Sequence, residues 1–437
     1  MTVPSASCNG TATAQRDELE RKYADRMHAA SELARLVSYV GNRRTPLLRL
    51  YRYKEAFSQS FVQHFMRFFE LSERDYVLDP FCGMGTTLLT SWLHGIPSVG
   101  LDRLPVAAFV AQTLPQFSCL ERGQIARTYE RLLAGVAEQP PAHIADDVRI
   151  IPLAFPARTL TRLRQWYTAI SGLQQPLRDI FRLLFYAILE ETSFTSKDGQ
   201  FLRLTRSRRP AQPDAALLRK CQEAEDDLAA LHYGMLGPAD PRRAPLPEVH
   251  CADARGGHGF RPARAPTAII TSPPYANRYD YTRTYCLELC FGFTSDFREL
   301  RAVRQDLLRS HIESKLRPGE RPAHPAVAEV ITSLSGHHLN NPRIPDMLIA
   351  YFADMASVVG AWSEWMAQGG RVAMVVDNVR FHGEHVPVDL ILCDLAAEVG
   401  FVTERVVVAR YKGNSSQQMG KYGRFPVRES VLIWRKV

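Results

Sequence analysis

One strand–turn–helix–strand unit near the start of the chain limits the fold more than any other part of the sequence. Residues 76–79 form an apolar run that ends in an acid, and they predict a short buried strand. Gly83 and Gly85 follow in a turn. Residues 88–94 then predict a helix, and residues 98–102 predict a second strand that also ends in an acid. Such a unit requires a parallel sheet covered by helices, so the sequence predicts an α/β fold.

The same unit predicts a ligand that contains a ribose. Gly83 and Gly85 let the backbone approach a ligand closely, because glycine has no side chain. Asp102 ends the second strand, where a carboxylate can accept hydrogen bonds from both ribose hydroxyls. The turn lacks the Gly-Lys-Ser/Thr ending of a phosphate-binding loop, which argues against hydrolysis of nucleoside triphosphates. The alternative is a purely structural turn with a buried Asp102.

A second strong signal lies at residues 268–275. The apolar run 268–271 predicts a buried strand, and the sequence Ser272-Pro273-Pro274-Tyr275 ends it abruptly. Proline has no N–H group and a fixed φ angle, so the carbonyl groups around it remain free and rigidly oriented. A hydroxyl, free carbonyls and an aromatic ring at the carboxyl edge of a sheet form a suitable clamp for a flat polar ring.

Four further strands complete the predicted sheet. Residues 248–255 contain a strand that runs into Asp253, and residues 371–376 form another apolar run. The chain closes with strands at 402–409 and 429–435. Because no helix separates the last two strands, they are expected to be antiparallel in an otherwise parallel sheet.

The remaining segments are mostly helical. Residues 16–40 have helical periodicity and predict an N-terminal helix. Residues 116–246 predict a helical insertion between the second and third strands of the sheet. Within it, residues 193–210 suggest a loop, and residues 317–343, rich in proline and glycine, also suggest loops.

Several basic segments suggest contact with nucleic acid. The chain carries 54 Lys and Arg against 46 Asp and Glu, a net charge of +8 that favours a polyanionic partner. Basic residues alternate with Ser, Thr and aromatic residues, a composition typical of phosphate contact and base stacking. The alternative is that these segments are simply solvated. The candidate nucleic-acid-binding residues are Lys197, Arg203, Arg206, Arg208, Arg209, Arg278, Tyr279, Arg283, Lys421 and Arg424.

Other classes of site find little support. The eight cysteines form no C-x-x-C pair and have no zinc-site spacing, and the pair His337-His338 has no carboxylate or cysteine spaced to join it in a metal site. The N-terminus lacks the apolar segment of a signal peptide, and no uninterrupted apolar run is long enough to span a membrane. We therefore expect a cytoplasmic protein without a metal and without a membrane partner.

Two segments resemble a known family. Residues 79–87, Asp-Pro-Phe-Cys-Gly-Met-Gly-Thr-Thr, resemble the cofactor motif of S-adenosylmethionine-dependent DNA amino-methyltransferases. Residues 271–275, Thr-Ser-Pro-Pro-Tyr, resemble their catalytic motif in its cytosine-N4 form. Met84 departs from the small residue usual in the family's turn. The resemblance implies a Rossmann-like class I methyltransferase, with a seven-stranded, mostly parallel sheet, an antiparallel C-terminal hairpin and, in this chain, a helical insertion.

The resemblance also implies roles for individual residues. Those expected to bind S-adenosylmethionine are Lys54, Phe57, Asp79, Pro80, Phe81, Gly83, Gly85, Thr86, Thr87, Asp102 and Asp253. Those expected to be catalytic are Ser272, Pro273, Pro274 and Tyr275. Residues 51–115 and 247–437 would form the catalytic domain, residues 1–50 an N-terminal extension, and residues 116–246 a region that contacts DNA.

The expected reaction is methyl transfer to cytosine N4 in double-stranded DNA after the base has flipped out of the helix. Ser272 and the Pro273 carbonyl would accept hydrogen bonds from the amino group, and Tyr275 would stack on the base. Serine at position 272 favours cytosine over adenine N6, the nearest alternative, although the cofactor motif here precedes the catalytic one. RNA methylation and binding without catalysis are further alternatives. A cognate restriction endonuclease is a candidate partner.

Overall fold

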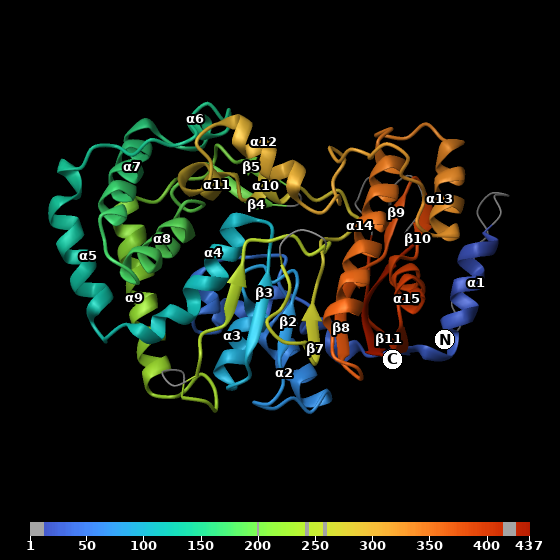
Figure 1. Cartoon of the computed structure of the whole chain (residues 1–437). Helices are drawn as coiled ribbons and strands as arrows, with labels where there is room; N and C mark the ends of the chain where they lie inside the picture. Colours follow the sequence, from blue (N-terminus) through green and yellow to red (C-terminus); the bar gives the residue numbers. More distant parts are fainter. Residues whose placement is uncertain (1–12, 199–200, 241–243, 257–259, 414–424) are drawn as a thin grey trace.

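The core of the molecule is an eight-stranded sheet. The computed structural model describes residues 13–198, 201–240, 244–256, 260–413 and 425–437. The strand order is β1-β11-β12-β8-β7-β2-β3-β6 (Figure 1). β12 is antiparallel to both of its neighbours, and all the other pairs are parallel. The strands are β1 (Met27–Ala29), β2 (Val77–Asp79), β3 (Ser98–Leu101), β6 (Glu248–His250), β7 (Ala268–Thr271), β8 (Arg371–Asp377), β11 (Phe401–Lys412) and β12 (Val427–Lys436).

The predicted fold is therefore confirmed, with one additional strand. All seven strands expected from the sequence are present, and the late pair β11 and β12 is antiparallel, as its short connection requires. β2, β3 and β7 are buried along their whole length, which explains why their sequences are continuous apolar runs rather than alternating ones.

The eighth strand corrects the prediction for residues 16–40. The expected helix ends early, since α1 spans only Ala14–Tyr23, and short 3₁₀ turns and β1 follow it. β1 pairs with β11, with Met27 opposite Val406, and the Ala30 N–H donates to the Val408 carbonyl at 3.0 Å. The edge strand β11 offers backbone N–H and C=O groups as hydrogen-bond partners to residues 27–30. This pairing with a distant strand outweighs the local helical preference of these residues, so they form a strand.

Helices cover both faces of the sheet, and successive strand residues point to opposite sides. Leu78 and Ile269 belong to the same core as α14 and α15, whereas Val77 and Ile270 face α2. The covering helices are α2 (Gln59–Phe68), α3 (Thr86–Leu93), α4 (Pro105–Thr113), α14 (Ile344–Trp365) and α15 (Val388–Glu398). α13 (Pro325–Ser335) packs on α14. By length and composition α14 could cross a membrane, but 61% of its apolar window is buried inside this molecule.

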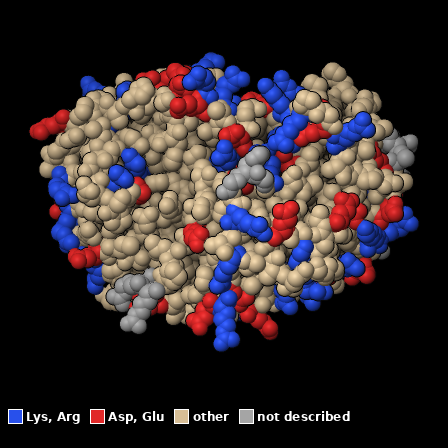
Figure 2. Space-filling view, viewed as in Figure 1, with Lys and Arg blue, Asp and Glu red and all other residues tan. Residues whose placement is uncertain are grey.

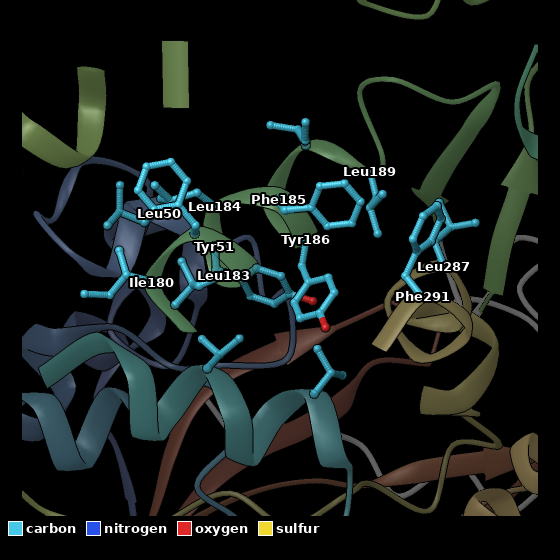
Figure 3. Close-up of a cluster of buried hydrophobic side chains, with 14 of the residues drawn as sticks. Leu50, Tyr51, Ile180, Leu183, Leu184, Phe185, Tyr186, Leu189, Leu287 and Phe291 are labelled. Carbon is cyan, nitrogen blue, oxygen red and sulfur yellow. The ribbon is translucent and has the colours of Figure 1, made fainter. Parts of the chain in front are cut away.

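The predicted helical insertion forms one end of the molecule (Figure 1). It contains α5 (Gln124–Gly135), α6 (Ile151–Ala154), α7 (Ala157–Ser171), α8 (Leu177–Ile188) and α9 (Pro213–His232), together with a hairpin of β4 (Thr195–Asp198) and β5 (Phe201–Leu204). The hairpin corrects the expectation of a loop at 193–210. Figure 3 shows how side chains of α8 gather with Leu50, Tyr51, Leu287 and Phe291 in one buried cluster.

A second loop prediction was also too simple. Residues 317–343 contain α13, which begins at Pro325, while His324 caps it by accepting the Ala326 N–H at 3.1 Å. Proline suits the first turn of a helix because its missing N–H is not needed there, so Pro325 marks a helix start rather than a loop. The remaining elements are α10 (Tyr281–Thr284), α11 (Cys286–Gly292), α12 (Phe297–Asp306), β9 (Val379–Phe381) and β10 (Glu384–Val386).

Candidate active site

A cavity of about 870 Å³, counting the space open to solvent, lies at the carboxyl ends of β2, β3, β6 and β7. The sheet brings together here most of the residues that the sequence assigned to the cofactor. Those that line the cavity are Phe57, Asp79, Pro80, Phe81, Gly83, Thr86, Asp102 and Asp253. This arrangement follows from the parallel strands, because their carboxyl ends meet at one edge.

The two glycines of the turn have different tasks. Gly83 and Gly85 have φ angles of +52° and +86°, which favour glycine. Gly83 lines the cavity, and its N–H donates to Asp102 at 2.9 Å. A Cβ atom at Gly85 would lie 2.8 Å from the Ala111 side chain, so Gly85 allows α3 to pack closely on α4. Gly85 and Thr87, whose hydroxyl donates to the Ile270 carbonyl at 3.1 Å, support the turn from behind the cavity wall.

Two carboxyl groups in the cavity have raised pKa values. Burial raises the pKa of Asp79 to about 7, although hydrogen bonds from the Thr271 hydroxyl and the Phe81 N–H oppose the shift. Burial likewise raises the pKa of Asp102 to about 6, against hydrogen bonds from the N–H groups of Leu104 and Gly83. Neither carboxylate has a cationic partner among these contacts, so each retains the capacity to accept hydrogen bonds from a ligand.

Asp253 is held differently, by a network of arginines. Burial opposes ionisation, but hydrogen bonds from Arg255 lower the pKa of Asp253 below its usual value. The Arg255 guanidinium lies 2.5 Å from Asp253 and 3.0 Å from Asp354, and Asp354 in turn contacts Arg309 at 2.6 Å. Arg255 also lines the cavity, although the sequence did not mark it out. The network fixes the part of the cavity wall that Asp253 and Arg255 form.

A second cavity of about 1000 Å³, counting open solvent, adjoins the first. It is lined by Ser272, Pro273 and Tyr275, whereas Pro274 faces the first cavity. Ser272 lines both cavities. The Ser272 hydroxyl lies 3.2 Å from the Val375 carbonyl oxygen and 3.4 Å from the Tyr275 hydroxyl. The predicted clamp therefore stands at the boundary between the two spaces.

Charged residues that the sequence did not mark out surround Tyr275. The Tyr275 hydroxyl donates to Glu429 at 3.4 Å, and Glu429 is ion-paired with Arg410 and Lys412. Lys412 also lies 3.2 Å from Asp377. Burial raises the pKa of Asp377 to about 7, although Lys412 opposes the shift. These residues stand on β8, β11 and β12, and only the antiparallel pairing of β12 brings them together.

Lys54 lies apart from the other expected cofactor residues. It lines the second cavity rather than the first, and its ammonium donates to the Lys197 carbonyl. Burial lowers the pKa of Lys54. The segment between Tyr53 and Phe57 crosses from one cavity to the other, and Glu55 and Ala56 line both.

The predicted nucleic-acid contacts fall into two groups. Arg203, Arg206 and Arg209 are exposed on β5 and the segment after it, and Arg283 is exposed but paired with Glu313. Figure 2 shows Lys and Arg along the upper rim of the molecule, interspersed with Asp and Glu, on the side to which β6 and β7 point in Figure 1. Lys421 and Arg424 lie outside the described residues.

The other predicted contacts are turned inward in this structure. Lys197 is buried, and its ammonium is ion-paired with Glu288 and lies 4.3 Å from the centre of the Tyr285 ring. The remaining three are Arg208, whose guanidinium donates to the Thr195 carbonyl at 2.7 Å, the half-buried Arg278 and the buried Tyr279. For Lys197 the expectation of direct phosphate contact is corrected, since the hairpin carries its side chain into the core.

No group of three or more His, Cys, Asp or Glu side chains within the described part of the chain is arranged to hold a metal ion. The groups that the two cavities present are carboxylates, hydroxyls, backbone carbonyls and aromatic rings, together with the basic residues beside them.

Comparison with known proteins identifies the family. The chain is 31% identical to the type II methyltransferase M.BsoBI of Geobacillus stearothermophilus, over 97% of this chain and 92% of the relative. It is 30% identical to the type II methyltransferase M.AvaI of Nostoc sp. (strain PCC 7120) and to that of Anabaena variabilis, in each case over 96% of this chain and 92% of the relative. No protein-family model matches the chain. Because the similarity runs through nearly the whole sequence, the chain belongs to the type II methyltransferases, a family of DNA methyltransferases.

Proposed function

We propose that this methyltransferase modifies the exocyclic N4 of cytosine in double-stranded DNA, using S-adenosylmethionine as the methyl donor and flipping the target base out of the helix. The observation that supports this most directly is the position of Ser272, which lines both the cavity with Asp79, Asp102 and Asp253 and the adjoining cavity with Tyr275. Methyl transfer requires donor and acceptor to meet at one point, and Ser272 marks that point.

The first cavity fits S-adenosylmethionine, the methyl donor used by the family. Asp102 is available to accept hydrogen bonds from ribose hydroxyls, and the absence of a side chain at Gly83 leaves room beside Tyr53. Asp253 would hold the adenine, and Asp79 with Phe81 would hold the methionine part. When bound there, the cofactor supplies an electrophilic methyl group on a sulfonium.

The second cavity would receive the flipped base. An amino nitrogen on a nucleobase is a poor nucleophile because its lone pair is delocalised into the ring. Hydrogen bonds from its protons to Ser272 and to the Pro273 carbonyl would hold it in the geometry for in-line attack. Tyr275 would stack on the base, since it lines the same cavity. Serine, rather than an acid or asparagine, supports cytosine over adenine as the target.

The proposal also covers the domain organisation of the chain, its protein partner and its location in the cell. Residues 51–115 and 247–437 would form the catalytic domain, residues 1–50 an extension, and residues 116–246 a region that contacts DNA through the exposed arginines of β5 and of the segment after it. The relatives' designation as type II methyltransferases supports a cognate restriction endonuclease as partner and a cytoplasmic, nucleoid-associated location.

The test is to identify the methylated product. The protein is incubated with methyl-labelled S-adenosylmethionine and either double-stranded DNA or RNA, the nucleic acid is digested, and the labelled nucleoside is identified. We expect N4-methyldeoxycytidine from DNA and no label in RNA. Label in N6-methyladenine would refute the cytosine assignment, and label in RNA would refute the DNA substrate.

A further inference from the structure

The predicted clamp orients an amino group but offers no good acceptor for a proton. The Ser272 hydroxyl is a weak base, and the Pro273 carbonyl accepts hydrogen bonds without accepting protons at neutral pH. When the amino nitrogen gains a methyl group, it must lose one of its two protons. A carboxylate beside the point of transfer would provide the missing acceptor.

Glu55 occupies that position. Among the residues that the structure describes, those that line both cavities apart from Ser272 are Glu55, Ala56 and Tyr281, and Glu55 is the only carboxylate in this set. The side chain is half-buried. It comes from the segment before α2, whereas Ser272 follows β7, so the two residues reach the boundary from separate parts of the chain.

Two tyrosines hold the Glu55 carboxylate in place. The Tyr285 hydroxyl donates to Oε2 at 2.6 Å, and the Tyr279 hydroxyl donates to Oε1. Each carboxylate oxygen has more than one lone pair, so both oxygens can accept a further hydrogen bond. Two fixed donors therefore orient the group in advance while leaving its capacity to accept a proton.

The other carboxylates that the structure describes around the two cavities either line only the first cavity or are ion-paired. Asp79 and Asp102 line the first cavity alone, where we assign them to the cofactor. Glu429 is ion-paired with Arg410 and Lys412, and Asp377 lies near Lys412. Asp253 is bound to Arg255. The hydrogen bonds that the structure describes for Glu55 come from hydroxyl groups instead. The charge of Lys54 is felt at Glu55, but the Lys54 ammonium donates to the Lys197 carbonyl.

We propose that Glu55 is a catalytic residue that accepts a proton from the target amino group. This inference rests on the proposed function. As the bond between nitrogen and methyl carbon forms and the bond between sulfur and methyl carbon breaks, the nitrogen becomes positively charged. One of its protons then moves to Glu55, which releases it to solvent once the product has left. Tyr279 and Tyr285 act as positioning residues, because their hydroxyl groups hold the Glu55 carboxylate.

The main experiment compares two ways of disrupting this arrangement. Glu55→Gln removes the proton acceptor but keeps its shape, whereas the double variant Tyr279→Phe/Tyr285→Phe keeps the carboxylate and removes its anchors. In single-turnover methylation of genomic DNA, we expect Glu55→Gln to slow the reaction about 100-fold and the double variant less than about tenfold. Equal losses would show that Glu55 only anchors the tyrosines and would overturn the proposal.

Binding of the cofactor provides a readout independent of turnover. The Kd values of S-adenosylmethionine and S-adenosylhomocysteine are measured by calorimetry for the wild type and Glu55→Gln. We expect both values to stay within about twofold of the wild type, because the carboxylate serves the base. Selective loss of affinity for S-adenosylmethionine would show that Glu55 instead stabilises the sulfonium charge, and the proposal would fail.

A third variant guards against a simple folding defect. Glu55→Asp retains a proton-accepting carboxylate on a shorter side chain, so it should keep more of the rate than Glu55→Gln. An equal loss in both would contradict the proposal. A wild-type protein that transfers no methyl group to DNA would overturn the proposed function and this inference together. Normal wild-type transfer with an unchanged rate in Glu55→Gln would overturn this inference alone.

Discussion

Asp102 links the chemistry of the cofactor cavity to pH. Its carboxyl group is buried enough to raise its pKa to about 6, and the neighbours that stabilise its charge are the N–H groups of Leu104 and Gly83. A ribose hydroxyl donates most strongly to an ionised carboxylate. In the proposed function, protonation of Asp102 therefore competes with binding of the cofactor, and we expect the competition close to neutral pH.

The affinity for S-adenosylmethionine should consequently fall in mild acid. Above pH 6 we expect Asp102 to be ionised and to bind the ribose. Below pH 6 each further drop of one pH unit should weaken binding by up to about tenfold, because binding must then release a proton. Asp102→Asn should bind more weakly at pH 8 and lack this component of the pH dependence. The measurement is the Kd by calorimetry between pH 5 and pH 8. A wild-type slope identical to that of Asp102→Asn would contradict the assignment.

The residues of the clamp should affect turnover without affecting the cofactor. We expect Ser272→Ala and Tyr275→Ala each to lower the methylation rate about 100-fold, while the Kd of S-adenosylmethionine changes little. Tyr275→Phe provides the matched control, since it keeps the ring but removes the hydroxyl that donates to Glu429. It should retain most of the rate if stacking on the base is the main task of Tyr275. Wild-type rates in both alanine variants would refute the clamp.

At the scale of single elements, the sequence predicted best where a pattern is local and strong. The buried strands β2, β3 and β7 are continuous apolar runs that end in an acid or in proline, and all three were predicted. β1 was missed because its strand conformation depends on the edge of β11, more than 370 residues away in the sequence. The hairpin of β4 and β5 was missed because its sequence is polar and mixed, without clean alternation.

Contacts between distant parts of the chain also limited how much of the candidate site could be predicted from the sequence. Residues inside recognisable motifs, such as Asp79, Asp102 and Ser272, were located from the sequence and line the two cavities. Glu55 and Glu429 were missed, because their importance depends on which distant strands and loops they approach. No spacing in the sequence indicates that β12 would place Glu429 beside Tyr275. Such contacts require the complete topology of the sheet.

The hairpin of β4 and β5 allows a test of DNA binding at the scale of one element. Arg206 and Arg209 are exposed just after β5. We expect Arg206→Ala/Arg209→Ala to weaken DNA binding and to reduce the slope of log K against log salt by about two, one for each phosphate left without its arginine. The matched control is Arg127→Ala/Arg131→Ala, which removes two exposed charges from α5. Equal slopes in the two double variants would remove the segment after β5 from the interface.

At the scale of the whole molecule, the insertion shares one hydrophobic core with the glycine turn and α4. Met84 from the glycine turn and Val110 from α4 belong to the same buried cluster as Leu184 of α8 and Leu287 of α11. The similarity to M.BsoBI also covers 97% of the chain, so the insertion belongs to what the relatives have in common. Both observations suggest that residues 116–246 fold together with the sheet rather than as a separate unit.

Unfolding experiments can test whether residues 116–246 and the sheet unfold together. Leu184 is fully buried, so Leu184→Ala should destabilise the protein by about 2–5 kcal/mol through reduced burial and an internal cavity. Leu218→Ala on α9 is the matched control, since Leu218 is 39% exposed and should change stability by less than about 1 kcal/mol.

If the core is shared, thermal unfolding remains a single transition in both variants. S-adenosylhomocysteine then raises the midpoint of that whole transition, because a ligand that binds only the folded state stabilises everything that unfolds with its site. Two transitions, with Leu184→Ala shifting one and the ligand shifting the other, would show instead that the insertion is an independent domain.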